Sequence, residues 1–362
     1  MMSPILSSVS LYAGPTAARH IRAHGFRQQD FTTLVGASGG PKWFVLYGLD
    51  RFLSAEFFAG RTQPLELFGS SAGAWRLACM AHPEPVKAIT ALALNYSRQC
   101  YSAQPSLAEI STEAEGLLTR MIGEASLDFL TEHPVFSLRI FADRCRGLLQ
   151  SEHSLLLGSG LALCGAANLV SRKTLPWFFE RTVFHGGSAE LKKANFLDMP
   201  TQFVRLRSGN LKAALMASGS IPLVMRGVTG IEAAAGVYRD GGMTDYHFNL
   251  PFHRQKGLVL YPHFYPQVIP GWFDKSLPWR RADQSHFDNV LMVVPSAEFV
   301  RRLPYGKIPD RKDFQRMDDE SRLKYWRQVL HESERLADEF AALIADGSGV
   351  DRLQNLRFGG WR

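Results

Sequence analysis

Hydrophobic and polar positions near the start of the chain form a strand, a glycine-rich turn and a helix. The apolar, β-branched run 31–35 predicts a buried strand. Small residues fill the turn at 36–40, and Pro41 suits the first turn of a helix, because its missing N–H would have no partner there. Apolar residues then recur at helical spacing from Val45 to Leu53.

The same order of elements repeats at once. Residues 65–68 predict a short strand, 69–73 form a second turn of small residues, and 74–81 predict a helix that ends before Pro83. Two such units in succession are typical of an α/β protein with parallel strands. Both turns would then lie at the carboxyl ends of their strands, which is where open α/β sheets place their functional sites.

The rest of the chain predicts more elements of the same kinds. Strands are expected at 135–141, 177–185, 201–206, 236–239, 257–261 and 289–294, and helices at 15–24, 109–130 and 316–346. The last helix has its apolar residues on one face, and Gly347 is expected to cap it. The mixed pattern over 97–191 lacks a flanking linker, so we interpret it as an insertion or cap within a single domain, 1–362.

Segment 155–170 is the longest uncharged stretch of the chain. Small residues interrupt it, and it is shorter than the ~18–20 apolar residues of a membrane span. We expect it to form a buried or small-residue-packed helix rather than a membrane anchor.

Composition excludes several classes of protein. The 362 residues are 46% hydrophobic and 21% charged, which is ordinary for a globular chain and argues against general disorder. The four cysteines form no C-x-x-C pair, so reduced thiols are expected. Residues 1–18 lack the basic start and long apolar run of a signal peptide, so we expect a cytoplasmic location.

The net charge narrows the choice of partners. Basic residues exceed acidic residues by 41 to 34, giving +7, but they are scattered and match no nucleic-acid-binding motif. The excess therefore favours an anionic lipid surface or an acidic substrate over nucleic acid. Segment 261–281 interleaves aromatic and basic residues, which suits peripheral contact with an anionic membrane and equally suits a loop packed over the core. A second basic cluster over 301–312 is interpreted as a solvated loop rather than a phosphate site.

The second glycine-rich turn carries the G-x-S-x-G pattern with Ser71 at its centre. A nucleophilic serine needs a sharp strand-to-helix turn, and Gly69 and Gly73 would let the strand and the helix approach closely. The following helix directs its N-terminal dipole at the site. The pentapeptide alone also fits an ordinary βα turn, but here it lies between a predicted strand and a predicted helix.

The first turn supplies candidate backbone donors. Successive amides at Ser38, Gly39 and Gly40 would form an anion-binding nest at a helix start, and Lys42 adds a positive charge. An oxyanion that forms on a carbonyl under attack needs such donors. The turn does not match the Walker A spacing, and the chain contains no G-x-G-x-x-G, so a nucleotide loop is unsupported.

A third pattern provides a candidate base. Asp240 follows a short predicted strand and precedes two glycines that permit an abrupt turn. A carboxylate with an ordinary pKa of ~3.9 is a weak base, so it would need burial and a short hydrogen bond to Ser71. Because Ser71 and Asp240 must meet across the intervening chain, they favour one sheet over two domains.

These three patterns, in this order, resemble the patatin-like phospholipase family of lipid acyl hydrolases. A further segment, 214–222, is similar to the family's A-S-x-x-x-P pattern, and the resemblance covers about 32–242. Ser38 and Trp43 depart from the family's glycine loop, and Trp43 is expected to narrow the space beside it. The resemblance implies a three-layer αβα fold, a Ser71–Asp240 dyad without histidine, and an oxyanion loop at 38–42.

By that resemblance the protein is a serine hydrolase that cleaves lipid or other acyl esters through an acyl-enzyme, without a metal or cofactor. The sequence does not specify the acyl chain, the head group or the oligomeric state.

Two alternatives stay open. A Ser–His–Asp hydrolase would use Ser71, with Asp240 or Asp245 and one of the later histidines, which are His247, His253, His263, His286 and His331. The departures at Ser38 and Trp43 also leave room for a catalytically inactive lipid-binding protein.

Overall fold

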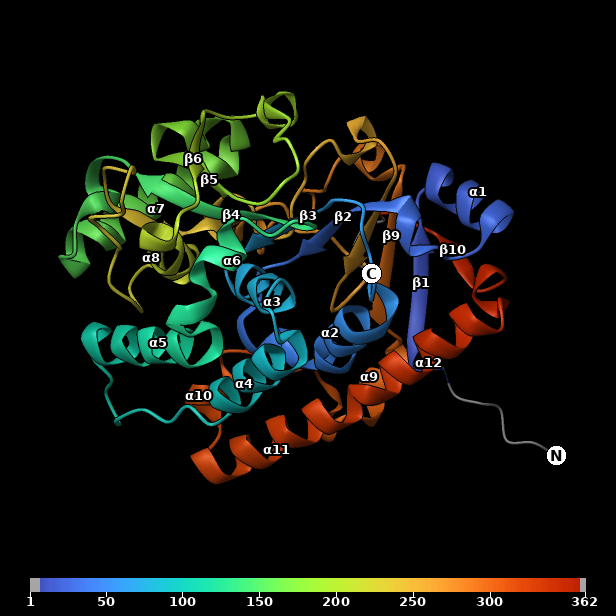
Figure 1. The fold of residues 1–362 in the computed structure, drawn as a ribbon. Helices are drawn as coiled ribbons and strands as arrows, with labels where there is room; N and C mark the ends of the chain where they lie inside the picture. The colour runs from blue at the N-terminus through green and yellow to red at the C-terminus, as the bar shows by residue number, and fades with distance from the viewer. Residues whose placement is uncertain (1–6, 359–362) are drawn as a thin grey trace.

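The structure is a computed structural model that describes residues 7–358 (Figure 1). The strands are β1 (Val9–Ala13), β2 (Phe31–Gly36), β3 (Leu65–Ser70), β4 (Phe136–Cys145), β5 (Phe179–His185), β6 (Thr201–Arg205), β7 (Tyr238–Asp240), β8 (Leu258–Pro262), β9 (Val290–Pro295) and β10 (Leu353–Asn355). The helices are α1 (Pro15–His24), α2 (Tyr47–Phe52), α3 (Ala72–Met80), α4 (Pro85–Ser97), α5 (Leu107–Ile122), α6 (Leu127–Thr131), α7 (Ser154–Val170), α8 (Ser208–Gly219), α9 (Ala297–Arg302), α10 (Asp313–Arg316), α11 (Asp319–Glu332) and α12 (Glu334–Ala345).

Within the described residues, ten strands form one mostly parallel sheet. Nine of them follow the order β10-β1-β9-β8-β2-β3-β4-β5-β6, and β7 pairs with β4. The antiparallel pairs are β1–β9, β4–β5 and β4–β7. The central strands are apolar almost throughout because the sheet is covered on both faces. The expected α/β class with a mostly parallel central sheet is confirmed.

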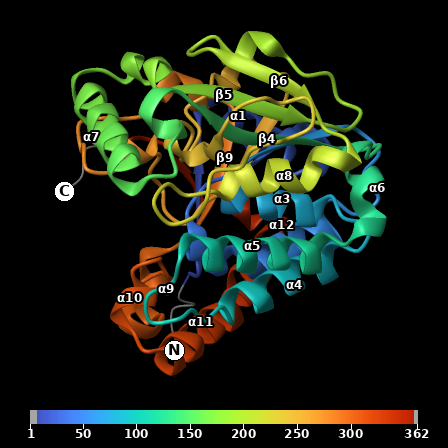
Figure 2. The same ribbon diagram turned by 90° about the vertical axis from the view of Figure 1, so that its left-hand side faces the viewer.

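Helices pack against the sheet at two separate places. Helices α3 and α8 pack directly on the central strands, and α4 and α5 lie outside them (Figure 2). Helix α1 lies beside β1, β9 and β10, far from this layer along the sheet (Figure 1). None of the helices in the described part of the chain is long and apolar enough to cross a membrane.

The segment 97–191 does not form an insertion. Its predicted strands exist, but they are β4 and β5, and β4 pairs along its length with β3 in the middle of the sheet. The insertion interpretation is therefore wrong. The mixed pattern arose because β4 joins a parallel neighbour to two antiparallel ones, which interrupts the regular alternation of strands and helices.

The C-terminal helix predicted over 316–346 is two helices, α11 and α12, which meet at Ser333. The buried Ser333 hydroxyl donates to the Leu330 carbonyl and accepts from the Gly48 amide at 3.0 Å. A Cβ at Gly48 would lie 2.6 Å from the Ser333 carbonyl oxygen, so α2 presses directly on the junction. Gly347 ends α12 with φ 74°, as predicted.

Segment 155–170 forms α7, but the helix is not buried. Its small face, which includes Gly160 and Cys164, packs inward, whereas Leu155, Leu163 and Val170 are 73, 57 and 85% exposed. Sequence periodicity could not reveal this because the inner and outer faces are both uncharged.

Candidate active site

The turn between β3 and α3 places Ser71 at the carboxyl edge of the sheet. Ser71 has φ 54° and ψ −129°, a strained backbone that holds its side chain away from both elements. A Cβ at Gly73 would lie 1.8 Å from the Gly36 carbonyl oxygen, and one at Gly69 would lie 2.5 Å from the Ala74 Cα. The two glycines therefore permit the close strand–helix contact on which the turn depends.

Asp240 reaches Ser71 from the end of β7. The Ser71 Oγ donates to the Asp240 Oδ2 at 2.8 Å, and the Gly242 amide donates to the Asp240 Oδ1 at 2.7 Å. Strand β7 pairs with β4, and this pairing places Asp240 opposite Ala142 of β4. In the sheet, β4 lies two strands from β2, with β3 between them. The predicted pair thus meets across 169 residues of sequence, and both side chains are less than a tenth exposed.

The surroundings of Asp240 strengthen it as a base. Burial raises the pKa of its carboxyl group, and the nearby Arg311 together with hydrogen bonds from Gly242 and Ser71 opposes that rise only in part. A raised pKa brings a carboxylate closer to the affinity for a proton that general-base work at neutral pH requires.

The backbone of the nucleophile turn is held by Ser218 of α8. The Ser71 amide donates to the Ser218 Oγ at 2.9 Å, and that hydroxyl donates to the Phe141 carbonyl at 2.6 Å. Ser218 lies in the 214–222 segment, which was noted in the sequence only for its resemblance. Its position assigns that segment a physical task, because it ties the strained turn to β4.

The first glycine-rich turn lies beside Ser71, but one of its three predicted donors is occupied. The Ser38 amide donates to the Tyr246 carbonyl at 3.0 Å, and the Ser38 Oγ donates to the Ser70 Oγ at 3.0 Å. The prediction that the Ser38 amide holds an oxyanion is therefore wrong. The amides of Gly39 and Gly40 donate to no other group within residues 7–358 and line the same cavity as Ser71.

Lys42 and Trp43, which follow this turn, lie in different surroundings. Lys42 lines the cavity, and burial lowers the pKa of its ammonium group. Trp43 is 1% exposed and packs on Phe44 in the core. It lines neither cavity at Ser71, so the expectation that it narrows the site is wrong.

Two cavities of different character meet at Ser71. One, of about 430 Å³, also contains Asp240 and is rich in polar and basic side chains, namely Ser38, Lys42, Tyr246, Lys275, Asp310, Arg311 and Lys312. The other, of about 600 Å³, is lined by apolar and aromatic side chains, namely Trp75, Tyr101, Pro105, Ile110, Val224, Met225 and Phe314, together with the polar Gln99, Ser102, Gln315 and Asp319. Gly40, Ser71, Ile221 and Arg311 line both cavities. Lys275 and Arg311 belong to the basic segments 261–281 and 301–312, and the interpretation of the second segment as a solvated loop is wrong for Arg311 and Lys312, which line the first cavity.

No histidine takes part in this arrangement among the described residues. His247 and His263 are fully buried, and their rings contact each other and neighbouring aromatic groups. Burial lowers the pKa of both imidazoles, that of His263 to about 3. Neither ring hydrogen-bonds Ser71 or Asp240, and no histidine lines either cavity.

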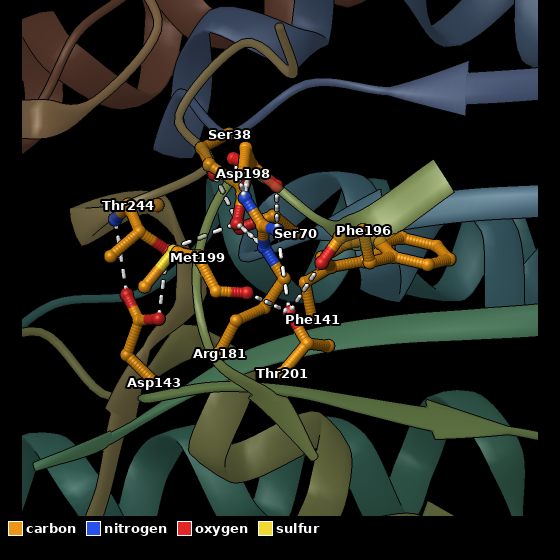
Figure 3. Close-up of polar contacts among 12 residues, drawn as sticks. Ser38, Ser70, Phe141, Asp143, Arg181, Phe196, Asp198, Met199, Thr201 and Thr244 are labelled. Carbon is orange, nitrogen blue, oxygen red and sulfur yellow. Dashed lines mark hydrogen bonds and ion pairs between the residues drawn. The ribbon is translucent and has the colours of Figure 1, made fainter. Parts of the chain in front are cut away.

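Asp245, the other candidate acid, belongs to a buried network with Arg181. Figure 3 shows Arg181 with other members of this network, Asp198, Thr244 and Asp143. The Arg181 guanidinium donates to Asp245 at 2.6 and 2.9 Å and to Asp198 at 2.6 and 2.8 Å. Burial lowers the pKa of Arg181, but the two carboxylates outweigh burial and raise it. The network anchors the chain just after Asp240 to β5.

Thr244 extends this network to Asp143 of β4. Its single hydroxyl lies 2.8 Å from the Asp143 Oδ1 and 3.0 Å from the Asp245 Oδ2. Burial and the nearby Asp245 raise the pKa of Asp143 well above its usual range. The Thr244 hydroxyl has one proton and lies within hydrogen-bond distance of both carboxyl groups, so it can donate to only one of them at a time.

No group of three or more His, Cys, Asp and Glu side chains in residues 7–358 is arranged to hold a metal ion. A scan against protein-family models finds no matching family, and a search of curated proteins finds no matching relative.

Proposed function

We propose that the protein is a patatin-like acyl hydrolase that cleaves lipid esters with a Ser71–Asp240 dyad. The observation that carries this proposal is the 2.8 Å hydrogen bond from the Ser71 Oγ to Asp240, made at a strained strand–helix turn between two cavities. A direct serine–carboxylate contact supports a dyad over a triad, because no imidazole lies where it would accept the serine proton.

The geometry suits acyl transfer in two steps. Ser71 attacks the ester carbonyl carbon while Asp240 accepts its proton, and the amides of Gly39 and Gly40 stabilise the negative oxygen. Asp240 then passes the proton to the departing alcohol, which leaves an acyl-enzyme. A water molecule, deprotonated by Asp240, attacks the acyl carbonyl, and Ser71 recovers its proton as the acid is released. This mechanism uses no metal or cofactor.

Labelling with a fluorophosphonate tests the nucleophile directly. We expect the wild-type protein to be labelled and to hydrolyse a short-chain ester, and Ser71→Ala to do neither. Ser285→Ala is the matched control, because Ser285 is exposed and lines neither cavity. If the wild-type protein takes up no label and turns over no ester, the alternative of an inactive lipid-binding protein replaces the enzyme.

A membrane is the proposed place at which lipid is met. The exposed face of α7 carries Leu155 and Leu163 and no charge, and Trp177, just beyond the helix, is 72% exposed. Phe273 packs near Gly165 of α7, and the adjacent Trp272 lines the active-site cavity. Lys173 and Arg281 are exposed basic residues close in sequence to Trp177 and Phe273, whereas Arg172 and Arg280 pair with the buried Asp274. An apolar face with exposed basic residues near it in sequence suits the surface of an anionic bilayer.

Flotation with vesicles tests this surface. Leu155→Glu combined with Leu163→Glu is expected to reduce recovery with anionic vesicles at least severalfold, because two charges would enter the apolar layer. Leu197→Glu, at an equally exposed leucine between β5 and β6, is the control and should float as wild type. Equal recovery of all three proteins would contradict the membrane contact.

A reducing, cytoplasmic location belongs to the same proposal, and the four cysteines, which form no disulfide in the described residues, agree with it.

A further inference from the structure

Basic side chains converge on one of the two cavities without carboxylate partners. Lys42, Lys275, Arg311 and Lys312 line it, and among residues 7–358 none of the four lies within ion-pair distance of an acidic group. The acidic residues of the cavity are already engaged, since Asp240 accepts from Ser71 and Gly242, and Asp310 faces Lys307 at 3.9 Å. When all six groups are ionised, the four positive charges of the cavity exceed its two negative charges, those of Asp240 and Asp310, by two.

Arg311 stands where the two cavities join. A Cβ built on Gly40 would lie 3.1 Å from the Arg311 Nε and 3.5 Å from the Tyr96 hydroxyl, so the guanidinium lies against the oxyanion turn. Arg311 also faces Asp240 closely enough to oppose the rise of its pKa. A ligand that reaches Ser71 from the basic cavity must therefore pass beside this cation.

Lys275 is an exposed residue that lines the cavity, and its ammonium group lies against two aromatic rings. Its Nζ lies 3.9 Å from the centre of the Tyr246 ring and 5.7 Å from that of Trp272. Burial lowers the pKa of this ammonium to about 7, and the nearby Arg311 and Lys42 lower it further while Asp240 opposes them. Cations that lie close together repel one another when no anion is bound between them. A bound anion would relieve this repulsion.

The second cavity carries fewer charges, since only Arg311 and Asp319 among its lining residues are charged. Its walls include Trp75, Ile110, Val224 and Met225, and no lysine lines it. An ester carbonyl at Ser71 would thus have an apolar space on one side and a basic space on the other. Hydrocarbon gains free energy from the first space, and a phosphate gains charge-assisted hydrogen bonds in the second.

We propose that the basic cavity binds a phosphate on the alcohol part of the ester, while the apolar cavity holds the acyl chain. This inference rests on the proposed function. The substrate class is an acyl ester whose alcohol carries a phosphate monoester, which bears ≈ −1.5 to −2 charges at neutral pH and matches the excess of the cavity. Hydrolysis breaks only the acyl C–O bond. Water supplies the hydroxyl of the released acid and the proton of the alcohol, and the phosphate leaves unchanged on the alcohol.

Paired substrates with one acyl chain test the proposal. We expect kcat/KM for an acylglycerol 3-phosphate to exceed that for the matching acylglycerol by roughly tenfold or more, because charge-assisted bonds are lost in the neutral ester. Lys275→Gln and Arg311→Gln should each reduce this preference severalfold. Lys324→Gln, an exposed lysine of α11 outside both cavities, is the matched control and should keep the preference.

The pH dependence has a definite sign. Lys275 is charged below its pKa of about 7, so the preference for the phosphate ester should decline as pH rises through that region. The other groups facing Lys275, which are Lys42, Arg311, Asp240 and Tyr246, also line the cavity. The decline should therefore be weaker in Lys275→Gln, in which that titrating amine is gone.

Binding measured on Ser71→Ala separates this inference from the proposed function. Glycerol 3-phosphate and inorganic phosphate are titrated by calorimetry against Ser71→Ala, with and without Lys275→Gln. Binding of glycerol 3-phosphate that Lys275→Gln weakens supports the phosphate pocket, even if no ester is hydrolysed and the proposed function fails. Equal kcat/KM for both esters, or binding of neither phosphate compound, overturns the phosphate pocket while leaving the Ser71 chemistry intact.

Discussion

Asp240→Asn is expected to lower kcat/KM for a neutral ester by roughly a thousandfold, within the range that a lost general base costs. The amide can still accept from the Gly242 amide, so the turn after β7 keeps its shape. It cannot take the Ser71 proton. Because burial raises the pKa of Asp240, an uncharged side chain should fit this position without loss of thermal stability.

The pH profile gives a second measure of the same residue. Asp240 acts as a base only when ionised, so wild-type activity should fall as pH falls through its pKa, which lies above the ordinary carboxyl value. In Asp240→Asn this acid limb should disappear from the residual activity. Asp351→Asn, an exposed carboxylate far along the chain, is the matched control. Wild-type rates in Asp240→Asn, with melting unchanged, would exclude the dyad.

Arg181→Leu is expected to reduce the free energy of unfolding by about 3–5 kcal/mol at neutral pH, measured by urea unfolding. Arg181 is 1% exposed and makes two hydrogen bonds to Asp245, which is itself 2% exposed. Without the guanidinium the Asp245 carboxylate keeps only the hydroxyl of Thr244 as a partner in this network. The cost is therefore that of a buried and uncompensated charge.

The controls for this prediction use charge position and pH. Arg207 pairs with Glu232 on the surface, where both side chains are half exposed, so Arg207→Leu should change the stability by less than about 1 kcal/mol. The deficit of Arg181→Leu should shrink as pH falls, because Arg181 lowers the pKa of Asp198 and this part of its stabilising effect is lost once that carboxyl group is protonated. Equal stabilities of Arg181→Leu and Arg207→Leu would show that the buried network adds nothing.

Local patterns in the sequence were sufficient to predict most elements. The strand–turn–helix units around Ser38 and Ser71 depend on residues within about ten positions of each other, so β2, β3 and α3 could be placed from runs and glycines alone. The same holds for Gly347, because a helix end that needs a positive φ is a local requirement. The break at Ser333 was not predictable, since it depends on contact with Gly48 from a distant helix.

The candidate site also has features that the sequence predicts and features that only the tertiary structure reveals. The sequence by itself determined the turn that carries Ser71 and the strand that ends in Asp240, because bond geometry and strand periodicity act between near neighbours. Three features depended on the tertiary structure alone. The Ser38 amide donates to the Tyr246 carbonyl, and segment 97–191 supplies central strands. Helix α7 exposes leucines on its outer face. The tertiary structure also decided the basic cavity, since Lys275 and Arg311 come from separate loops. Pairing of strands far apart in the chain brings such groups together, and hydrophobic periodicity carries no record of which strands pair.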